Sequence, residues 1–149
     1  MTGVPADLTF RSFGAADYDE LIALWNRVGL SHKPRGRDRR EALVRELKNP
    51  ASRLILAVHR QRIVGSVLAT HDGRKGWINR LAVDTSFQHR GLGGQLIGEA
   101  ERFLRHQDIR IIACLIEDFN TPSLNLFVKC GYQEFKGVHY LTKKEHPEV

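Results

Sequence analysis

The sequence has little cysteine and no long hydrophobic run, and both absences exclude classes of protein. Cys114 and Cys130 are the two cysteines among 149 residues, too few for a disulfide scaffold and typical of a reducing compartment. The longest apolar run, Ile111 to Ile116, is far shorter than the ~20 residues of a membrane-spanning helix. The N-terminal MTGVPADLTF lacks a basic stretch followed by an apolar one, which predicts no signal peptide. We therefore expect a cytoplasmic protein with no membrane partner.

The sequence also lacks internal repeats and low-complexity segments, and its composition is that of an ordinary globular protein. Hydrophobic residues make up 42% and charged residues 27%. The length predicts one domain that spans residues 1–149, with a single core. Lys and Arg exceed Asp and Glu by 23 to 17, a net charge of +6, which suits an acidic or phosphorylated partner without requiring one.

Hydrophobic periodicity predicts alternating strands and helices. Strands are expected at 8–13, 54–58, 63–70, 77–83, 111–116, 133–135 and 138–142, and helices at 17–28, 41–48, 92–106 and from 121 to a stop at Gly131. The loop between 58 and 63 is short enough for an antiparallel hairpin, and the apolar run 111–116 predicts a strand covered on both faces. The pattern indicates an α/β fold, with a mixed sheet of about seven strands and helices on both of its faces.

The strongest chemical pattern is the glycine-rich turn between the strand 77–83 and the helix 92–106. Its sequence is Gln88-His89-Arg90-Gly91-Leu92-Gly93-Gly94. Glycines let backbone N–H groups approach a ligand closely, and a helix N-terminus favours an anion. The turn is not a P-loop, because no Gly-Lys-Ser/Thr follows, and Leu96 replaces the third glycine of the dinucleotide fingerprint. A pyrophosphate cradle and a turn with no ligand are the two remaining interpretations.

Two motifs in the sequence resemble those of the GNAT (Gcn5-related) N-acetyltransferase superfamily. Gln88-x-x-Gly91-x-Gly93 after Leu81-Ala82-Val83 resembles its motif A, and Asn120-x-x-Ser123-x-x-Leu126-Phe127-x-x-x-Gly131-Tyr132 resembles its motif B. The likeness extends over nearly the whole chain. Leu24-Trp25 and His71-Asp72-Gly73 are similar to short bacterial YpeA-type members. The resemblance implies an acyltransferase that moves an acetyl group from acetyl-CoA directly to a primary amine, on a small molecule or a peptide N-terminus.

The resemblance also implies where acetyl-CoA binds, namely where the fourth and fifth strands splay apart. The implied cofactor-binding residues are Leu81, Ala82, Val83, Gln88, His89, Arg90, Gly91, Leu92, Gly93, Gly94, Asn120 and Phe127. Asn120 has the alternative role of a polar residue ahead of a helix. Phe127 departs from the family, whose motif B has a tyrosine here that protonates the departing thiolate.

The catalytic groups are less clearly indicated than the cofactor site. A protonated amine cannot attack a thioester, so a base must remove its proton. Strand 77–83 contains no carboxylate, so Glu117 and Asp118 are the candidate bases, with an exposed structural pair as the alternative. Tyr140 is the candidate proton donor in place of Phe127. The alternative is that Tyr140 is a surface residue with no catalytic role.

Basic residues concentrate between Arg27 and Lys48, a segment with eight basic residues and three acidic ones. In the resembled family this segment borders the acceptor site, so an acidic amine acceptor is one expectation and a solvated loop the other. A nucleic-acid partner is not expected, because no RNA- or DNA-binding motif accompanies the cluster. Histidine and cysteine spacing predicts no metal site. An acyl-CoA sensor with little catalysis is the alternative function, favoured by Phe127, and a homodimer is left open.

Overall fold

The computed structural model describes residues 3–149 and contains one five-stranded sheet. Its strands are β1 (Thr9–Ser12), β2 (Ser52–His59), β3 (Arg62–His71), β4 (Lys75–Val83) and β5 (Ile111–Ala113), in the order β1-β2-β3-β4-β5. The first four pair antiparallel in sequence order, and β5 pairs parallel to β4. The sheet is therefore mixed, as predicted.

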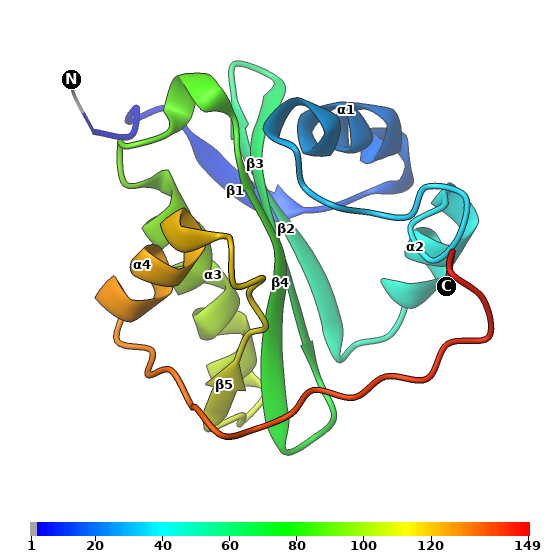
Figure 1. Ribbon diagram of the computed structural model, residues 1–149. Coiled ribbons are helices and arrows are strands. Elements are labelled where there is room, and N and C mark those ends of the chain that lie inside the picture. Colours follow the sequence, from blue (N-terminus) through cyan, green and yellow to red (C-terminus); the bar gives the residue numbers. More distant parts are fainter. Residues whose placement is uncertain (1–2) are drawn as a thin grey trace.

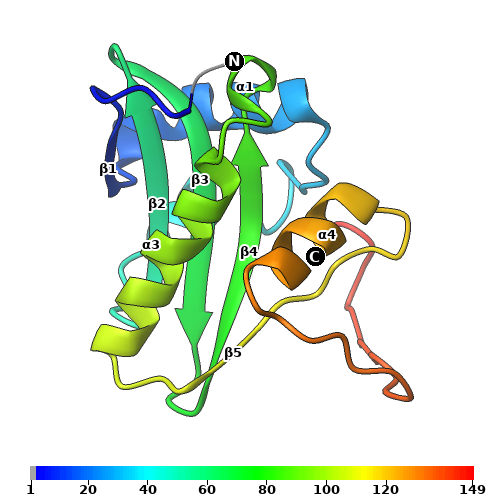
Figure 2. The ribbon, with the colours of Figure 1, turned by 90° about the vertical axis from the view of Figure 1, so that its left-hand side faces the viewer.

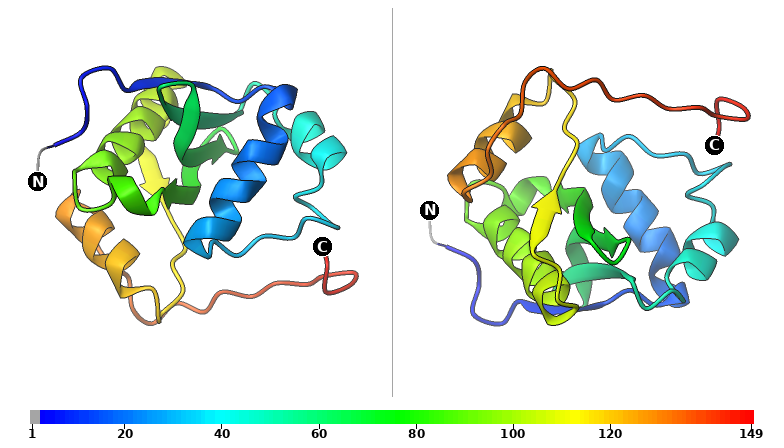
Figure 3. Two further views of the ribbon diagram at one scale, coloured as in Figure 1. Left: turned by 90° about the horizontal axis from the view of Figure 1, so that it is seen from above. Right: turned by 90° about the horizontal axis from the view of Figure 1, so that it is seen from below.

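Helices cover both faces of this sheet (Figures 1 and 3). Helices α1 (Tyr18–Val28) and α2 (Arg40–Glu46) lie on one face, and α3 (Leu92–His106) and α4 (Thr121–Lys129) on the other. Each face has its own apolar cluster. One contains Leu21, Leu24 and Trp25 of α1, and the other contains Leu96, Ile97 and Leu104 of α3. Between β4 and β5 the chain crosses over through α3, which lies along the sheet (Figure 2).

The two longest helices lie close to their predicted bounds, although α1 begins at Tyr18 rather than Asp17. Helix α3 has the predicted bounds, since its apolar residues recur at helical spacing and five of them are buried. Helix α1 ends at Gly29, whose φ of 72° places it in the left-handed region that glycine adopts without strain. Within residues 3–149, no helix has the length and apolar character needed to cross a membrane.

The prediction of about seven strands is wrong, because the segments 133–135 and 138–142 form no strand. The chain after α4 is an extended tail that leaves the sheet and passes towards α2 (Figures 1 and 3). A strand needs a hydrogen-bonded neighbour, and no backbone hydrogen bond of the described residues involves 133–144. Phe135, Val138 and Leu141 are consequently exposed.

Strand β5 is also shorter and more exposed than predicted. It ends at Ala113 rather than residue 116, and Ile111 and Leu115 are 59% and 51% exposed. The prediction of a strand covered on both faces is therefore wrong. The apolar run stays exposed because the tail does not pack beside β5 to complete the sheet.

Candidate active site

Strand β4 contains a bulge that changes which side chains face each side of the sheet. Opposite β3, Ser66 pairs with Ala82 but Leu68 pairs with Asn79, so β4 has one extra residue there. Arg80 lies in the bulge with a φ of +54°. The hydroxyl of Ser66 donates to the Arg80 carbonyl over 2.8 Å, and Trp25 Nε1 donates to the same hydroxyl over 2.9 Å. Ser66 and Trp25 are fully buried, so the bulge is a rigid feature of the core.

The side chain of Arg80 ties this bulge to the basic segment before α2. Its guanidinium donates to both carboxylate oxygens of Asp38, over 3.1 and 2.8 Å, and to the Ser31 carbonyl over 3.2 Å. Asp38 is 4% exposed and also accepts from the Lys33 backbone N–H over 2.7 Å. The segment predicted as a possible solvated loop is therefore fixed against β4 by a buried ion pair.

Strands β4 and β5 pair over only three residues, ending at Trp77 with Ala113. From Ile78 to Val83, β4 has no hydrogen-bonded neighbour other than β3 among residues 3–149. Among the described residues this leaves one edge of β4, along Leu81 and Val83, without a strand neighbour, and on it the Val83 carbonyl accepts from the Gln88 side chain. The predicted splay of the two strands stays a prediction, because the register establishes only where pairing stops.

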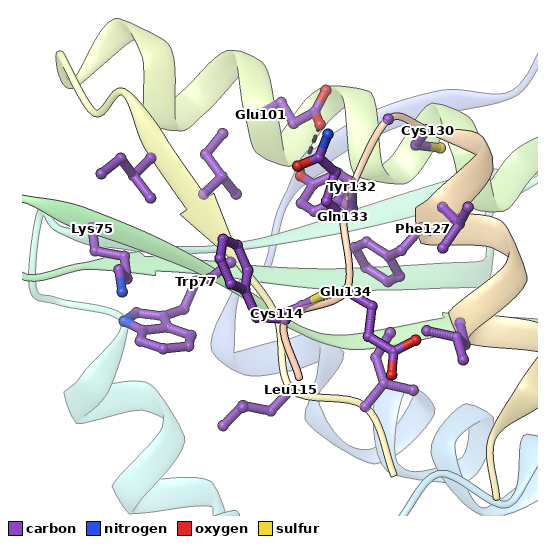
Figure 4. A pocket seen from close by; sticks show the side chains of 18 of the residues that line it. Lys75, Trp77, Glu101, Cys114, Leu115, Phe127, Cys130, Tyr132, Gln133 and Glu134 are labelled. Atoms are coloured by element: carbon purple, nitrogen blue, oxygen red, sulfur yellow. Dashed lines mark hydrogen bonds between the residues drawn. The ribbon is translucent and has the colours of Figure 1, made fainter. Parts of the chain in front are cut away.

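Two cavities adjoin the point where pairing stops. The larger one, called the β5–α4 cavity, has a volume of about 1400 Å³ and is lined by β5, α4 and the tail, including Cys114, Phe127 and Tyr132 (Figure 4). The smaller one, called the β4–α2 cavity, has a volume of about 410 Å³ and is lined by residues such as Leu43, Glu46, Asn79 and Arg80. Trp77, Leu115 and Tyr140 line both. Neither cavity includes the glycine turn, which lies at the other end of β4.

The glycine turn presents a continuous row of free backbone donors. Gly91 precedes α3 with a φ of 92°, a conformation that favours glycine. Within the described part of the chain, the N–H groups from His89 to Gly94 donate no hydrogen bond. A Cβ at Gly91 or Gly94 would meet nothing within 4 Å outside its own helix, so the surface beside these two glycines is open. A helix N-terminus with free N–H groups attracts an anion, and the turn therefore fits the predicted pyrophosphate.

Neighbouring residues hold this turn in place. Asp84 is 8% exposed, accepts from the Ser86 backbone N–H and hydroxyl, and pairs with Arg27 of α1 at 2.6 Å. Gln88 Nε2 donates to the Val83 carbonyl over 3.0 Å. Burial by itself would raise the pKa of Asp84, but Arg27 and Ser86 outweigh it and hold that pKa below its ordinary value. The carboxylate is thus the anchor between α1, β4 and the turn.

The other residues predicted to bind the cofactor differ in which of their atoms a ligand could reach. The side chains of Ala82 and Leu92 are in the core, so these residues offer only their backbone. Arg90 points back to the Gly3 carbonyl and the Phe87 ring. A Cβ on Gly93 would lie 2.8 Å from Leu126 Cδ2, so Gly93 also serves the packing of α3 on α4.

The two motif B residues expected at the cofactor, Asn120 and Phe127, both have structural roles. Asn120 caps α4, its side-chain oxygen accepting from the Ser123 backbone N–H over 3.3 Å. Phe127 is 4% exposed and packs edge-on against Tyr132, with ring centroids 5.0 Å apart. Tyr132 donates to Glu101 over 2.8 Å (Figure 4), and burial together with that carboxylate raises the pKa of Tyr132. Tyr132 is therefore held as a neutral phenol.

The predicted catalytic residues are all exposed and gather at the β5–α4 cavity. Glu117, Asp118 and Tyr140 line it, and Tyr140 also lines the β4–α2 cavity. A cysteine nucleophile is not favoured there, since burial raises the pKa of Cys114 to about 11. A carboxylate missed from the sequence is Glu46, which lines the β4–α2 cavity. Its spacing of three from the buried Leu43 on α2 was the available indication.

No group of three or more His, Cys, Asp or Glu side chains within residues 3–149 could hold a metal ion. Metal independence nonetheless stays a prediction.

The sequence profile described as the acetyltransferase (GNAT) family matches residues 17–132. The chain belongs to the GNAT acetyltransferase family. This match contains both the glycine turn and the free edge of β4, and it establishes the family-level expectation from motifs A and B.

Solved structures of acetyltransferases share the fold. The aminoglycoside acetyltransferase AAC(6')-Iy, in complex with a CoA-containing bisubstrate analogue, has 20% identity and a TM-score of 0.76, over 92% of this chain and 98% of that one. Another aminoglycoside acetyltransferase, meta-AAC0020 from an uncultured soil metagenomic sample, has 20% identity and a TM-score of 0.75, over 93% and 97%. A predicted acetyltransferase from Clostridium acetobutylicum, with acetyl-CoA, has 16% identity and a TM-score of 0.73, over 94% and 99%. At these identities the likeness establishes the fold.

Proposed function

We propose that this GNAT protein is an N-acetyltransferase that moves an acetyl group from acetyl-CoA directly to a primary amine. The observation that carries the proposal is the row of unpartnered N–H groups from His89 to Gly94, at the end of a strand whose other edge is free. The row suits a pyrophosphate, and the unpaired edge along Leu81 and Val83, apart from the Val83 carbonyl that Gln88 occupies, suits the amide groups of the pantetheine arm. The CoA and acetyl-CoA complexes of structural neighbours support this cosubstrate.

The proposed chemistry uses this chain's residues for proton transfer and charge stabilisation. A backbone N–H near Leu81 is the proposed donor to the developing oxyanion. Tyr140 is the proposed donor to the departing thiolate, and its place at the rim of both cavities supports that role. Glu117 and Asp118 stay as the sequence-derived candidates for the base. Asn120 and Phe127 are proposed to line the cofactor from the α4 side.

An acidic acceptor receives less support from the structure than from the composition. Arg27 and Arg40 of the basic segment pair with Asp84 and Asp19, and of that segment's basic residues Arg37 lines the β4–α2 cavity. Three further points also stay predictions: membership among the YpeA-type proteins, a cytoplasmic location and a homodimer.

The experiment that tests the proposed function measures free thiol release from acetyl-CoA in the presence of a panel of primary amines. The proposal expects amine-dependent release and an acetylated product of matching mass. Acetyl-CoA binding without release for any amine would contradict it and favour the acyl-CoA sensor.

A further inference from the structure

From the β4–α2 cavity we infer that this GNAT protein acetylates a small amine with a single ammonium group, and that Glu46 is the base that deprotonates it. The inference rests on the proposed function and names its acceptor site. The cavity volume of about 410 Å³ lies in the range of small-molecule sites. About half of its wall is apolar, including Leu43, Leu54 and Leu68, and the rest is polar or charged.

The position of the cavity connects it to the acetyl group. Trp77 is the last β4 residue that pairs with β5, and Leu115 follows the end of β5. Both residues line the cavity, together with Asn79 two residues further along β4. A thioester bound along the free edge of β4 would therefore reach the cavity where the two strands stop pairing.

Glu46 is the carboxylate of this cavity that is left for a ligand. The other one, Asp38, is engaged by both its oxygens with Arg80 and by the Lys33 backbone. In residues 3–149, the Glu46 carboxylate makes neither a hydrogen bond nor an ion pair. A free carboxylate in a partly apolar cavity suits an ammonium group.

The place of Glu46 disfavours its charge, which indicates a role other than stability. It lies in the last turn of α2, where the helix dipole opposes a negative charge. Glu46 is exposed as a residue, but partial desolvation of its carboxyl group beside the cavity, followed by the charge of Asp38, raises the pKa of Glu46, while Arg80 and Arg37 act in the opposite direction. A carboxylate kept at an electrostatic cost beside a cavity is a functional candidate, and a raised pKa suits a base.

The same wall limits the number of charges on the acceptor. Arg37 lines the cavity with Glu46, and Arg80 and Asp38 neutralise each other, so a second ammonium group would find no second free carboxylate and would lie near Arg37. Spermidine and kanamycin are therefore expected to be poor acceptors, although some structural neighbours are aminoglycoside acetyltransferases.

The proton balance of the step is complete without another reactant. Glu46 takes one proton from the ammonium group, and the free amine nitrogen attacks the thioester carbonyl. The C–N bond forms and the C–S bond breaks. Tyr140 gives its proton to the thiolate and recovers the second amine proton. The products are the N-acetyl amine and CoA thiol, and Glu46 returns its proton to solvent.

The test measures thiol release with phenethylamine, tryptamine and leucine amide as single-ammonium acceptors, and with spermidine and kanamycin. We expect kcat/KM for the best of the first three to exceed that of the last two at least about tenfold, because like charges disfavour binding. Glu46→Gln should lower kcat with that amine at least about 100-fold. Its affinity for acetyl-CoA should not change and its Tm should not fall, whereas Glu46→Asp should restore part of the rate.

The control is Glu41→Gln, on the same helix but lining neither cavity, which should behave as wild type. Wild-type activity in Glu46→Gln, or a loss confined to Glu117→Gln or Asp118→Asn, would overturn the assignment of the base. Faster acetylation of kanamycin or spermidine would overturn the acceptor class. Thiol release with none of the five amines would instead contradict the proposed function.

Discussion

Phe127 is the residue at which this chain departs most clearly from motif B. It is buried and packs edge-on against Tyr132, while Tyr132 donates to Glu101. The two rings form a packed unit, in which a phenol at position 127 would not replace a missing acid. Tyr140 lines both cavities, next to the place where β4 and β5 stop pairing.

The first prediction compares Phe127→Tyr with Tyr140→Phe. Tyr140→Phe should lower kcat about 10²–10⁴-fold, the usual contribution of a general acid. Phe127→Tyr should leave kcat unchanged or lower it, because a hydroxyl placed in a packed apolar contact needs a partner. Steady-state kinetics with one accepted amine measures both. A large gain in Phe127→Tyr, with no loss in Tyr140→Phe, would show that the acid is missing and support the sensor function.

Sequence reasoning at the residue scale located the glycine turn but not the second cavity. Gln88 to Gly94 form a motif of consecutive residues, which the sequence shows directly. The contact between Arg80 and Asp38 joins residues that are 42 positions apart. It depends on a β-bulge that the sequence pattern of the strand does not predict. Glu46 was therefore counted only as one acid within a basic segment.

At the scale of elements, the turn before α3 depends on a single carboxylate that joins three parts of the fold. Asp84 pairs with Arg27 of α1, caps the short turn at Ser86 and directly follows β4. The amphipathic pattern predicted each helix separately, because periodicity reports which face is buried. It could not predict this link between them.

The second prediction is that Asp84→Asn destabilises the fold by about 1–3 kcal/mol, since it removes charge-assisted hydrogen bonds at a buried position. The pKa of folded Asp84 is depressed, so the stabilisation by the carboxylate is fully present above the ordinary Asp pKa of about 3.9. It is lost as the pH falls through the lower folded pKa. Urea unfolding of both proteins from pH 7 to pH 3 measures this difference. A constant difference over the whole range would contradict the role of the carboxylate charge.

At the scale of the whole molecule, the tail after α4 distinguishes the observed fold from the predicted one. Apolar residues such as Phe135 and Val138 predicted two strands, but a strand also needs a neighbour. The tail instead crosses towards α2 (Figure 1), where a Cβ on Gly36 would lie 1.8 Å from the Glu148 carbonyl oxygen. Non-local contacts of this kind decide sheet membership, and residue patterns do not report them.

The third prediction is that limited trypsin digestion cuts first at Lys136, Lys143 or Lys144. These residues lie in an exposed segment without backbone hydrogen bonds among the described residues, and such segments open most easily. The basic segment before α2 is the control, because Asp38 and three backbone hydrogen bonds fix it. Mass spectrometry of the first fragments identifies the site. An initial cut at Arg35 or Arg37 would contradict this order of stability.

The central claim of the account is that acetyl-CoA binds at the glycine turn, and calorimetry of Gly91→Asp tests it most directly. Gly73→Asp is the matched control: its φ of 91° equals that of Gly91 to within a degree, and a Cβ there also meets nothing within 4 Å. Both variants carry similar backbone strain and the same added charge, but only position 91 adjoins the free N–H row. We predict that Gly91→Asp weakens acetyl-CoA binding more than about tenfold, because a carboxylate there repels the pyrophosphate, and that Gly73→Asp binds as wild type does. Equal affinities of Gly91→Asp and wild type would contradict the account.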